Sequence, residues 1–356
     1  MYYETLDALI RKYERTPKQY AFKAKTQEEH QVWKERARAR LREITGYNDC
    51  ETAEPAPQLV QTCEMEGFRR ESWLITTEPD IRMPFYLLRP ERAGGAAVLV
   101  LHGHGGGKEM LITDPGEGKP TFAEELAREG YMVFCPDERG SGERRERFEQ
   151  GDSREASRGN SHRELQQAAI GFGQSMVGWA MWDLMRLVDY IETLPEVEKG
   201  RIGCAGFSGG GQLTLWLAAL DERISAAMTG GYFYGMTDSL VEMCNNCACN
   251  FVPYMWKTMD MGDLGALVAP RALFIENGAE DPLSGRRGLE NVYEQVEITR
   301  KAYMLYGLEE RLTHRVHPGG HVWSGVGVKD FFLEFLRVGN YVAEGVFKEN
   351  AGNAGR

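Results

Sequence analysis

A serine flanked by glycines is the residue best placed for chemistry in this sequence. The pentapeptide Gly206-Phe207-Ser208-Gly209-Gly210 follows an expected buried strand over 201–205 and precedes an apolar helix over 212–220. A Gly-x-Ser-x-Gly turn between strand and helix strains the serine backbone and requires glycine-sized neighbours. It exposes the hydroxyl near the positive end of the helix. We therefore predict that Ser208 is a nucleophile; the alternative is a glycine-rich surface turn.

A serine hydroxyl becomes an effective nucleophile only beside a general base. His321 follows the last expected strand, over 312–316, on a loop bent by Pro318-Gly319-Gly320. This position allows its imidazole to reach back over the sheet to Ser208. His314 and His317 lie within or at the end of the same strand, so structural roles are expected for them.

The base in turn needs a carboxylate that fixes its tautomer. Asp281 lies on the loop after an expected strand over 272–276 and gives the chain order Ser, Asp, His. That order is the one found in α/β-hydrolases. The competing candidates for the acid are Glu276, Glu280 and Asp238.

Acyl transfer also needs hydrogen-bond donors where the oxyanion forms. The backbone N–H of Gly209 is one predicted donor, and that of His104, in the glycine-rich loop 102–107, is the second. The glycine spacing of this loop fits neither a dinucleotide-binding fingerprint nor a P-loop. With a base, an acid and two donors supplied by the chain, we expect no cofactor and no metal.

The elements around these residues alternate between strands and helices. Strands are expected over 69–76, 83–88, 96–101, 131–135, 201–205, 224–228, 272–276 and 312–316, and helices over 122–129, 179–194 and 328–338. This pattern predicts an α/β fold with a mostly parallel sheet covered by helices on both faces. Ligands of such sheets bind beyond the carboxyl ends of the strands, where the candidate residues gather.

The domain prediction separates an N-terminal helical arm and linker, 1–57, from a catalytic domain, 58–356. Two amphipathic helices are expected in the arm, with Leu6, Leu9 and Leu41 among the apolar positions that pack onto the body. Cap insertions are expected near 143–172 and 232–262. The second carries several aromatic residues, which could line a pocket or simply belong to the core.

Together these motifs resemble the α/β-hydrolase superfamily, and within it the dienelactone-hydrolase-like and acetyl xylan esterase-related branch. The resemblance spans about residues 60–340 and rests on the loop 102–107, the Pro136-Asp137-Glu138-Arg139-Gly140 segment, Trp182-Asp183, the serine turn and Gly320-His321. It implies an α/β-hydrolase fold. Dienelactone hydrolases proper have a cysteine nucleophile; the serine here favours ester hydrolysis.

Composition narrows the range of partners. The 356 residues carry a formal net charge of −11, which disfavours nucleic acid as a partner. The sequence contains no apolar stretch of the length that a membrane span needs, and its N-terminus lacks the pattern of a signal peptide.

Seven cysteines without disulfide-scaffold density favour a reducing cytoplasm. Cys244, Cys247 and Cys249 could suggest zinc, but no second Cys or His pair follows at finger-like spacing.

The predicted function is a serine carboxylesterase that hydrolyses short-acyl, acetyl-type esters, with carbohydrate esters as a plausible class and a small-molecule ester as partner. Two alternatives remain open: a serine peptidase of the prolyl-oligopeptidase type, and a non-catalytic binding protein on a hydrolase scaffold. The sequence leaves the natural acyl and alcohol groups undetermined, and it leaves open whether the chain forms a homo-oligomer.

Overall fold

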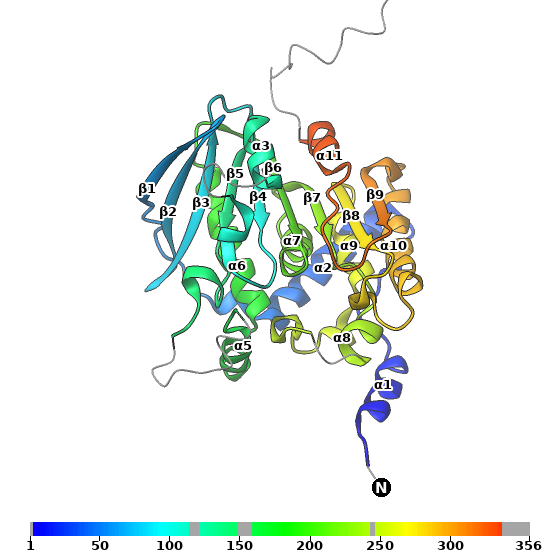
Figure 1. The fold of residues 1–356 in the computed structure, drawn as a ribbon. Coiled ribbons are helices and arrows are strands. Elements are labelled where there is room, and N and C mark those ends of the chain that lie inside the picture. Colours follow the sequence, from blue (N-terminus) through cyan, green and yellow to red (C-terminus); the bar gives the residue numbers. More distant parts are fainter. Residues whose placement is uncertain (1–2, 114–120, 148–158, 243–245, 337–356) are drawn as a thin grey trace, which may run out of the picture.

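A nine-stranded sheet runs through the centre of the computed structural model, which describes residues 3–113, 121–147, 159–242 and 246–336. The strand order is β1-β2-β3-β5-β4-β6-β7-β8-β9, from one side of the molecule to the other (Figure 1). The strands are β1 (Gln58–Met65), β2 (Phe68–Glu78), β3 (Ile81–Pro90), β4 (Gly95–Leu101), β5 (Met132–Pro136), β6 (Val197–Phe207), β7 (Ile224–Gly230), β8 (Ala272–Gly278) and β9 (Leu312–His317).

The sheet is antiparallel at one side and parallel through the rest. Strands β1, β2, β3 and β5 pair antiparallel, whereas β5-β4-β6-β7-β8-β9 pair parallel. The parallel strands arise from continuous apolar runs such as Ala96–Leu101, because both of their faces are covered. The predicted α/β fold, with a mostly parallel sheet, is confirmed. Strand β1 was not predicted.

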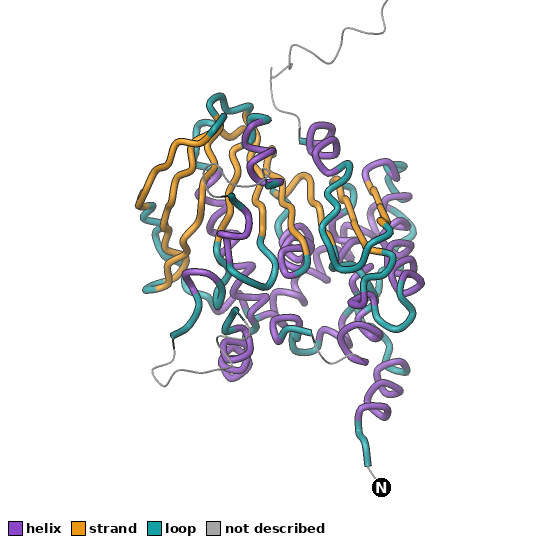
Figure 2. The backbone as a smooth tube through the Cα atoms, in the orientation of Figure 1, coloured by secondary structure: helices purple, strands orange, loops and turns teal. Residues whose placement is uncertain are grey.

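Helices cover both faces of the sheet (Figure 2). The helices are α1 (Leu6–Glu14), α2 (Gln27–Thr45), α3 (Phe122–Arg128), α5 (His162–Gly171), α6 (Met176–Ile191), α7 (Gly209–Leu220), α8 (Met255–Thr258), α9 (Met261–Val268), α10 (Leu289–Met304) and α11 (Val328–Phe335). The smaller apolar core contains side chains of α3 and α11, and the larger one contains side chains of α2, α6, α7, α9 and α10.

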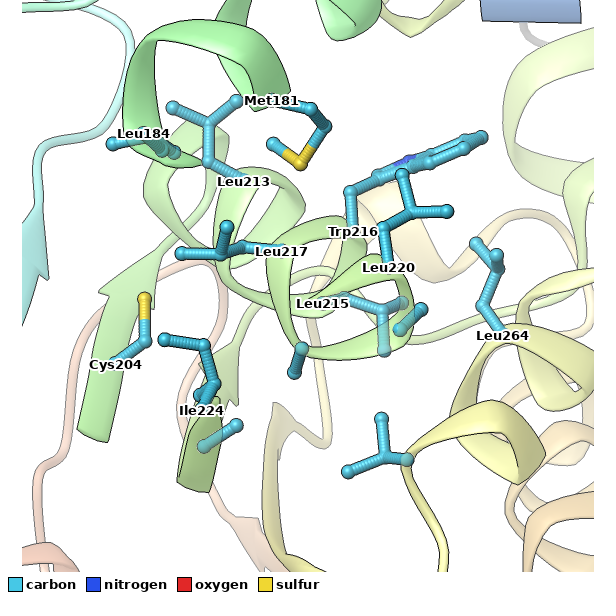
Figure 3. Packing of buried hydrophobic residues seen from close by; sticks show 14 of the residues in the cluster. Met181, Leu184, Cys204, Leu213, Leu215, Trp216, Leu217, Leu220, Ile224 and Leu264 are labelled. Atoms are coloured by element: carbon cyan, nitrogen blue, oxygen red, sulfur yellow. The ribbon is translucent and has the colours of Figure 1, made fainter. Parts of the chain in front are cut away.

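The helix that follows the serine turn is the centre of the larger core. Every residue of α7 is buried, including Trp216 and Leu217 (Figure 3). Leu213 and Leu217 lie among side chains of the neighbouring elements, Leu184 of α6 and Ile224 of β7 (Figure 3). A helix that is apolar all round is held on every side, so the backbone at its first turn has a fixed position.

The two N-terminal helices differ in how they pack. In α2, the Thr26 side chain caps the first turn by accepting from Glu29 N, and Ala37 and Leu41 are buried in the larger core. Helix α1 has no buried residue: Leu6 and Leu9 are 38% and 51% exposed, so the prediction that these two pack onto the body is wrong, whereas Tyr13 packs edge to face on Trp256. Within the described residues, no helix is long and apolar enough to cross a membrane.

Candidate active site

The serine turn has the strained geometry that its sequence predicts. Strand β6 ends at Phe207, helix α7 begins at Gly209, and Ser208 between them has φ 58° and ψ −117°. Few residues other than glycine adopt positive φ, and such strain persists only where neighbours hold it. Here the Ser208 N–H donates to Gly230 O at 2.8 Å, and Ser208 O accepts from Gln212 N at 2.9 Å.

The flanking glycines are needed because other backbone segments pass close by. A β-carbon on Gly206 would lie 2.4 Å from the carbonyl of Gly210, and one on Gly210 would lie 2.0 Å from Leu101 O. Neither backbone segment can move aside without displacing a buried strand or helix. The sequence therefore places glycine where only a hydrogen atom fits.

Three side chains predicted from separate parts of the chain form one hydrogen-bonded series. The Ser208 hydroxyl lies 2.8 Å from His321 Nε2, and His321 Nδ1 lies 2.7 Å from Asp281 Oδ2. A carboxylate can only accept, so Nδ1 carries the proton and Nε2 accepts from the serine. Asp281 is buried, and its other oxygen accepts from Leu283 N at 2.9 Å. The imidazole is thus oriented to remove the Ser208 proton.

The other candidate acids are exposed or bind groups other than His321. Asp238 pairs with Arg287 at 2.9 Å, and Glu280 is exposed. Glu276 is fully buried and accepts from Ser324 N and Gly325 N at 3.0 and 3.1 Å. Its carboxylate therefore fixes the loop that follows His321. Sequence reasoning weighed Glu276 as an acid and missed this positioning contact.

The other late histidines face different partners. His314 Nε2 lies 3.3 Å from Asn277 Oδ1, and burial lowers the pKa of His314 to about 4. His317 Nδ1 accepts from Gly319 N at 3.1 Å. Of the three, the structure brings His321 to Ser208.

Two backbone N–H groups adjoin the nucleophile. A β-carbon on Gly209 would lie 3.2 Å from His104 N, so the two predicted donors are close neighbours. Within the described parts of the chain, no acceptor takes the N–H of either Gly209 or His104. Two backbone donors that lie beside a nucleophile without an acceptor could stabilise an oxyanion.

The loop that carries His104 is anchored from below by a buried carboxylate. Asp137, after β5, accepts from Lys108 N at 2.7 Å and from Glu143 N at 3.0 Å, and pairs with Lys108 Nζ at 2.9 Å. At the start of the loop, His102 Nδ1 donates to Gly103 O and Nε2 accepts from Glu138 N. Burial lowers the pKa of His102, which keeps it neutral and able to make both bonds. Sequence reasoning did not assign these supports.

A cavity of about 640 Å³ opens beside Ser208 and His321. Its wall includes Gly103 and His104 of the loop 102–107, which we call the oxyanion loop after its proposed role. The wall also includes apolar side chains, those of Met110, Leu111, Phe122, Phe207 and Trp323. This size and lining suit a small organic substrate. The aromatic residues of the second expected cap insertion differ in their burial. Tyr232 and Tyr234 are buried in the core, whereas Tyr254 is 65% exposed.

A second cluster lies behind the oxyanion loop. His104, His162, Cys247 and Cys249 present ligand atoms that all lie within 4.8 Å of one another. No second Cys or His pair follows Cys247 and Cys249 at finger-like spacing, but the structure brings two histidines beside them from distant segments. Cys244 lies outside the described residues. The only sequence signal for His162 was its residue type within a charged stretch.

Comparisons with known proteins agree with this fold. The model of the Abhydrolase family matches residues 3–302. A Bacillus subtilis (strain 168) protein named "Putative hydrolase YtaP" is 28% identical over 253 residues, covering 67% of this chain and 80% of that protein.

Among solved structures, a Bacteroides fragilis NCTC 9343 protein titled "putative acetyl xylan esterase" has a TM-score of 0.72 at 21% identity, covering 93% of this chain and 89% of its own. A glucuronoyl esterase from Solibacter usitatus has a TM-score of 0.62 at 16% identity, with coverages of 91% and 97%. At these identities the two structures establish a shared fold.

Proposed function

Since the chain belongs to the Abhydrolase family, we propose that it is a serine carboxylesterase that hydrolyses short-acyl, acetyl-type esters, including those of carbohydrates. The observation that carries the proposal is the hydrogen-bonded series from Ser208 through His321 to Asp281. Two unused N–H groups beside it, those of Gly209 and His104, support the same chemistry.

The reaction proceeds in two stages. Ser208 Oγ attacks the ester carbonyl while His321 Nε2 takes its proton, and the N–H groups of Gly209 and His104 bind the oxyanion. His321 then protonates the leaving alcohol, which leaves an acyl-serine. Water, deprotonated by the same imidazole, attacks the acyl carbon and releases the carboxylic acid and Ser208. Asp281 stabilises the imidazolium in both stages, so this chemistry calls for no metal or cofactor.

The substrate class rests on the cavity and on the relatives. A space of about 640 Å³ beside Ser208, with Trp323 and Phe122 in its wall, accommodates a short acyl group and one sugar-sized alcohol. Aromatic faces suit the C–H face of a sugar ring. The solved structures that share the fold include proteins titled as acetyl xylan and glucuronoyl esterases.

The test is a substrate panel on the purified chain: p-nitrophenyl esters of graded acyl length, acetylated sugars and aminoacyl amides. We expect acetate to be hydrolysed faster than long-chain esters, and acetylated sugars to be deacetylated. The kcat of the Ser208→Ala variant should be at least ~10⁴-fold lower than that of wild type, because removal of a triad member leaves only residual catalysis. A serine-directed phosphonate should label wild-type protein at Ser208 and leave Ser208→Ala unlabelled.

Ser324→Ala is the matched control, because Ser324 lines the same cavity while its hydroxyl accepts from the neighbouring Val326 N–H. It should keep both turnover and labelling. Faster cleavage of aminoacyl amides than of esters would favour a serine peptidase. Absence of both turnover and labelling in wild-type protein would favour a binding protein.

A further inference from the structure

Three segments that are distant in sequence meet behind the oxyanion loop. His104 belongs to that loop, His162 is the first residue of α5, and Cys247 and Cys249 flank Ala248 in the second cap insertion. His104 Nε2 lies 3.1 Å from Cys249 Sγ, and His162 Nδ1 lies 3.3 Å from Cys247 Sγ. The rings of His104 and His162 pack edge to face, with centroids 5.3 Å apart. Each imidazole therefore presents one nitrogen to a sulfur.

The spacing of these four atoms matches a tetrahedral metal site. Zinc binds sulfur at about 2.3 Å and imidazole nitrogen at about 2.0–2.1 Å, so the ligand atoms of a tetrahedron stand roughly 3.3–3.8 Å apart. The four atoms here lie within 4.8 Å of one another, and the two N···S distances are already 3.1 and 3.3 Å. The largest separation lies at most about 1 Å beyond the range for a tetrahedron, so side-chain shifts on the order of 1 Å would complete it.

The groups around the cluster resemble the outer shell of a metal site. His162 Nε2, the nitrogen that faces away from the thiols, lies 2.9 Å from Ser141 Oγ and 3.6 Å from a Glu138 carboxylate oxygen. A hydroxyl and a carboxylate at this position orient a metal-binding imidazole. The Gln212 amide also donates to Cys249 O at 3.1 Å, which fixes the backbone of that cysteine.

The cysteines of the cluster differ from the other buried cysteines. Cys204 lies inside the sheet with Thr214 Oγ1 as its polar neighbour at 3.4 Å, and burial raises its pKa to about 12. In the cluster, each thiol instead lies beside an imidazole nitrogen, and these contacts pair Cys249 with His104 and Cys247 with His162.

We propose that His104, His162, Cys247 and Cys249 bind a divalent metal ion of the zinc class in a closed, four-ligand structural site. Two sulfur and two imidazole ligands suit Zn²⁺, and four protein ligands leave no position for a catalytic water. Binding displaces the thiol protons, and two thiolates balance the charge of the ion. This revises the expectation of a chain without metal while leaving the hydrolytic steps unchanged.

A metal at this site would affect the oxyanion loop, because His104 belongs to both. A β-carbon on Gly209 would lie 3.1 Å from the His104 ring, so the ring that binds the metal lies against the nucleophile turn. The metal would tie the oxyanion loop to α5 and to the second cap insertion. Its role is to position these segments.

Metal content tests the proposal without any ester substrate, so its failure and the failure of the proposed esterase activity are distinguishable. Full-length chain is purified under reducing conditions, stripped with a chelator, exposed to excess Zn²⁺ and desalted. We expect about one zinc per chain by plasma mass spectrometry. Replacement by Co²⁺ should give a thiolate-to-cobalt charge-transfer band and the visible bands of a tetrahedral site.

Cys247→Ser and His162→Ala should each lose most of the bound zinc, and Cys247→Ser should weaken the charge-transfer band. Cys63→Ser is the matched control, because Cys63 is half-buried on β1 and should leave both signals intact. Circular dichroism separates loss of a ligand from loss of fold. Less than about 0.1 zinc per wild-type chain, a cobalt spectrum without the charge-transfer band, or a Cys247–Cys249 disulfide under these conditions would overturn the proposal.

Discussion

Replacing Asp281 by asparagine probes the proposed triad with the smallest change of shape. One Asp281 oxygen accepts from His321 Nδ1 at 2.7 Å and the other accepts from Leu283 N at 2.9 Å. An asparagine has a single acceptor oxygen to serve both donors. The backbone N–H of Leu283 cannot change, whereas the imidazole can shift its proton. The amide NH₂ therefore turns toward His321.

That orientation forces the imidazole into the unproductive tautomer. Nδ1 must then accept, so Nε2 carries the proton and can no longer take one from Ser208. Loss of the correct tautomer in a serine triad costs ~10⁴ in turnover. At about 1.36 kcal/mol per factor of ten, this is about 5.5 kcal/mol of transition-state stabilisation.

The assay compares kcat and KM for p-nitrophenyl acetate in Asp281→Asn and Glu280→Gln, with urea unfolding of both variants to exclude loss of fold. Glu280→Gln is the matched control, because Glu280 precedes Asp281 on the same loop but is exposed. We expect it to stay within a few-fold of wild type. If Asp281→Asn kept kcat within about tenfold of wild type, Asp281 would not be the orienting acid. If Glu280→Gln were the more damaging change, the acid would be reassigned.

Two further predictions concern the turn and the fold. Gly206→Ala should abolish turnover and lower the urea midpoint, because its β-carbon would lie 2.4 Å from the Gly210 carbonyl; a variant with normal kcat would refute the steric argument. Burial lowers the pKa of His30 to about 4, below the unfolded value near 6.5. The resulting stability is present above pH 6.5 and is lost as the pH falls toward 4. The thermal midpoint should therefore fall over this range, and His30→Gln should flatten that slope; an equal slope in both proteins would contradict the assignment.

The candidate triad could be predicted because its signals are local. A glycine-flanked serine between an apolar run and an apolar helix identifies the turn, and parallel strands put their carboxyl ends at one edge. Loops after β8 and β9 must therefore converge on the loop after β6. Asp281 and His321 could be predicted from their residue types and their places on loops after strands, although Glu276, Glu280 and Asp238 remained open as the acid.

The parts that sequence reasoning missed have signals that are weak or non-local. All eight residues of β1 are exposed or half-exposed, so the strand has no buried face whose alternation could mark it in the sequence. The apolar positions of α1 have helical spacing, but this periodicity does not indicate whether another part of the chain packs over them. The cluster behind the oxyanion loop joins His104 to Cys249 across 145 positions and His162 to Cys247 across 85. Such proximity depends on how two insertions fold over the sheet.

His104 takes part in both proposals. Its proposed role as a ligand is the one that requires a histidine at position 104. As an oxyanion donor it acts through its backbone N–H, for which any residue except proline would serve. As a ligand it acts through Nε2, for which the imidazole is required. An oxyanion donor is effective only when its N–H already points to the developing charge. A side chain held 3.1 Å from the Cys249 sulfur limits rotation of the backbone that carries this N–H. The cluster and the nucleophile turn are therefore parts of one rigid arrangement, in which a metal would supply position and the backbone would supply the charge stabilisation.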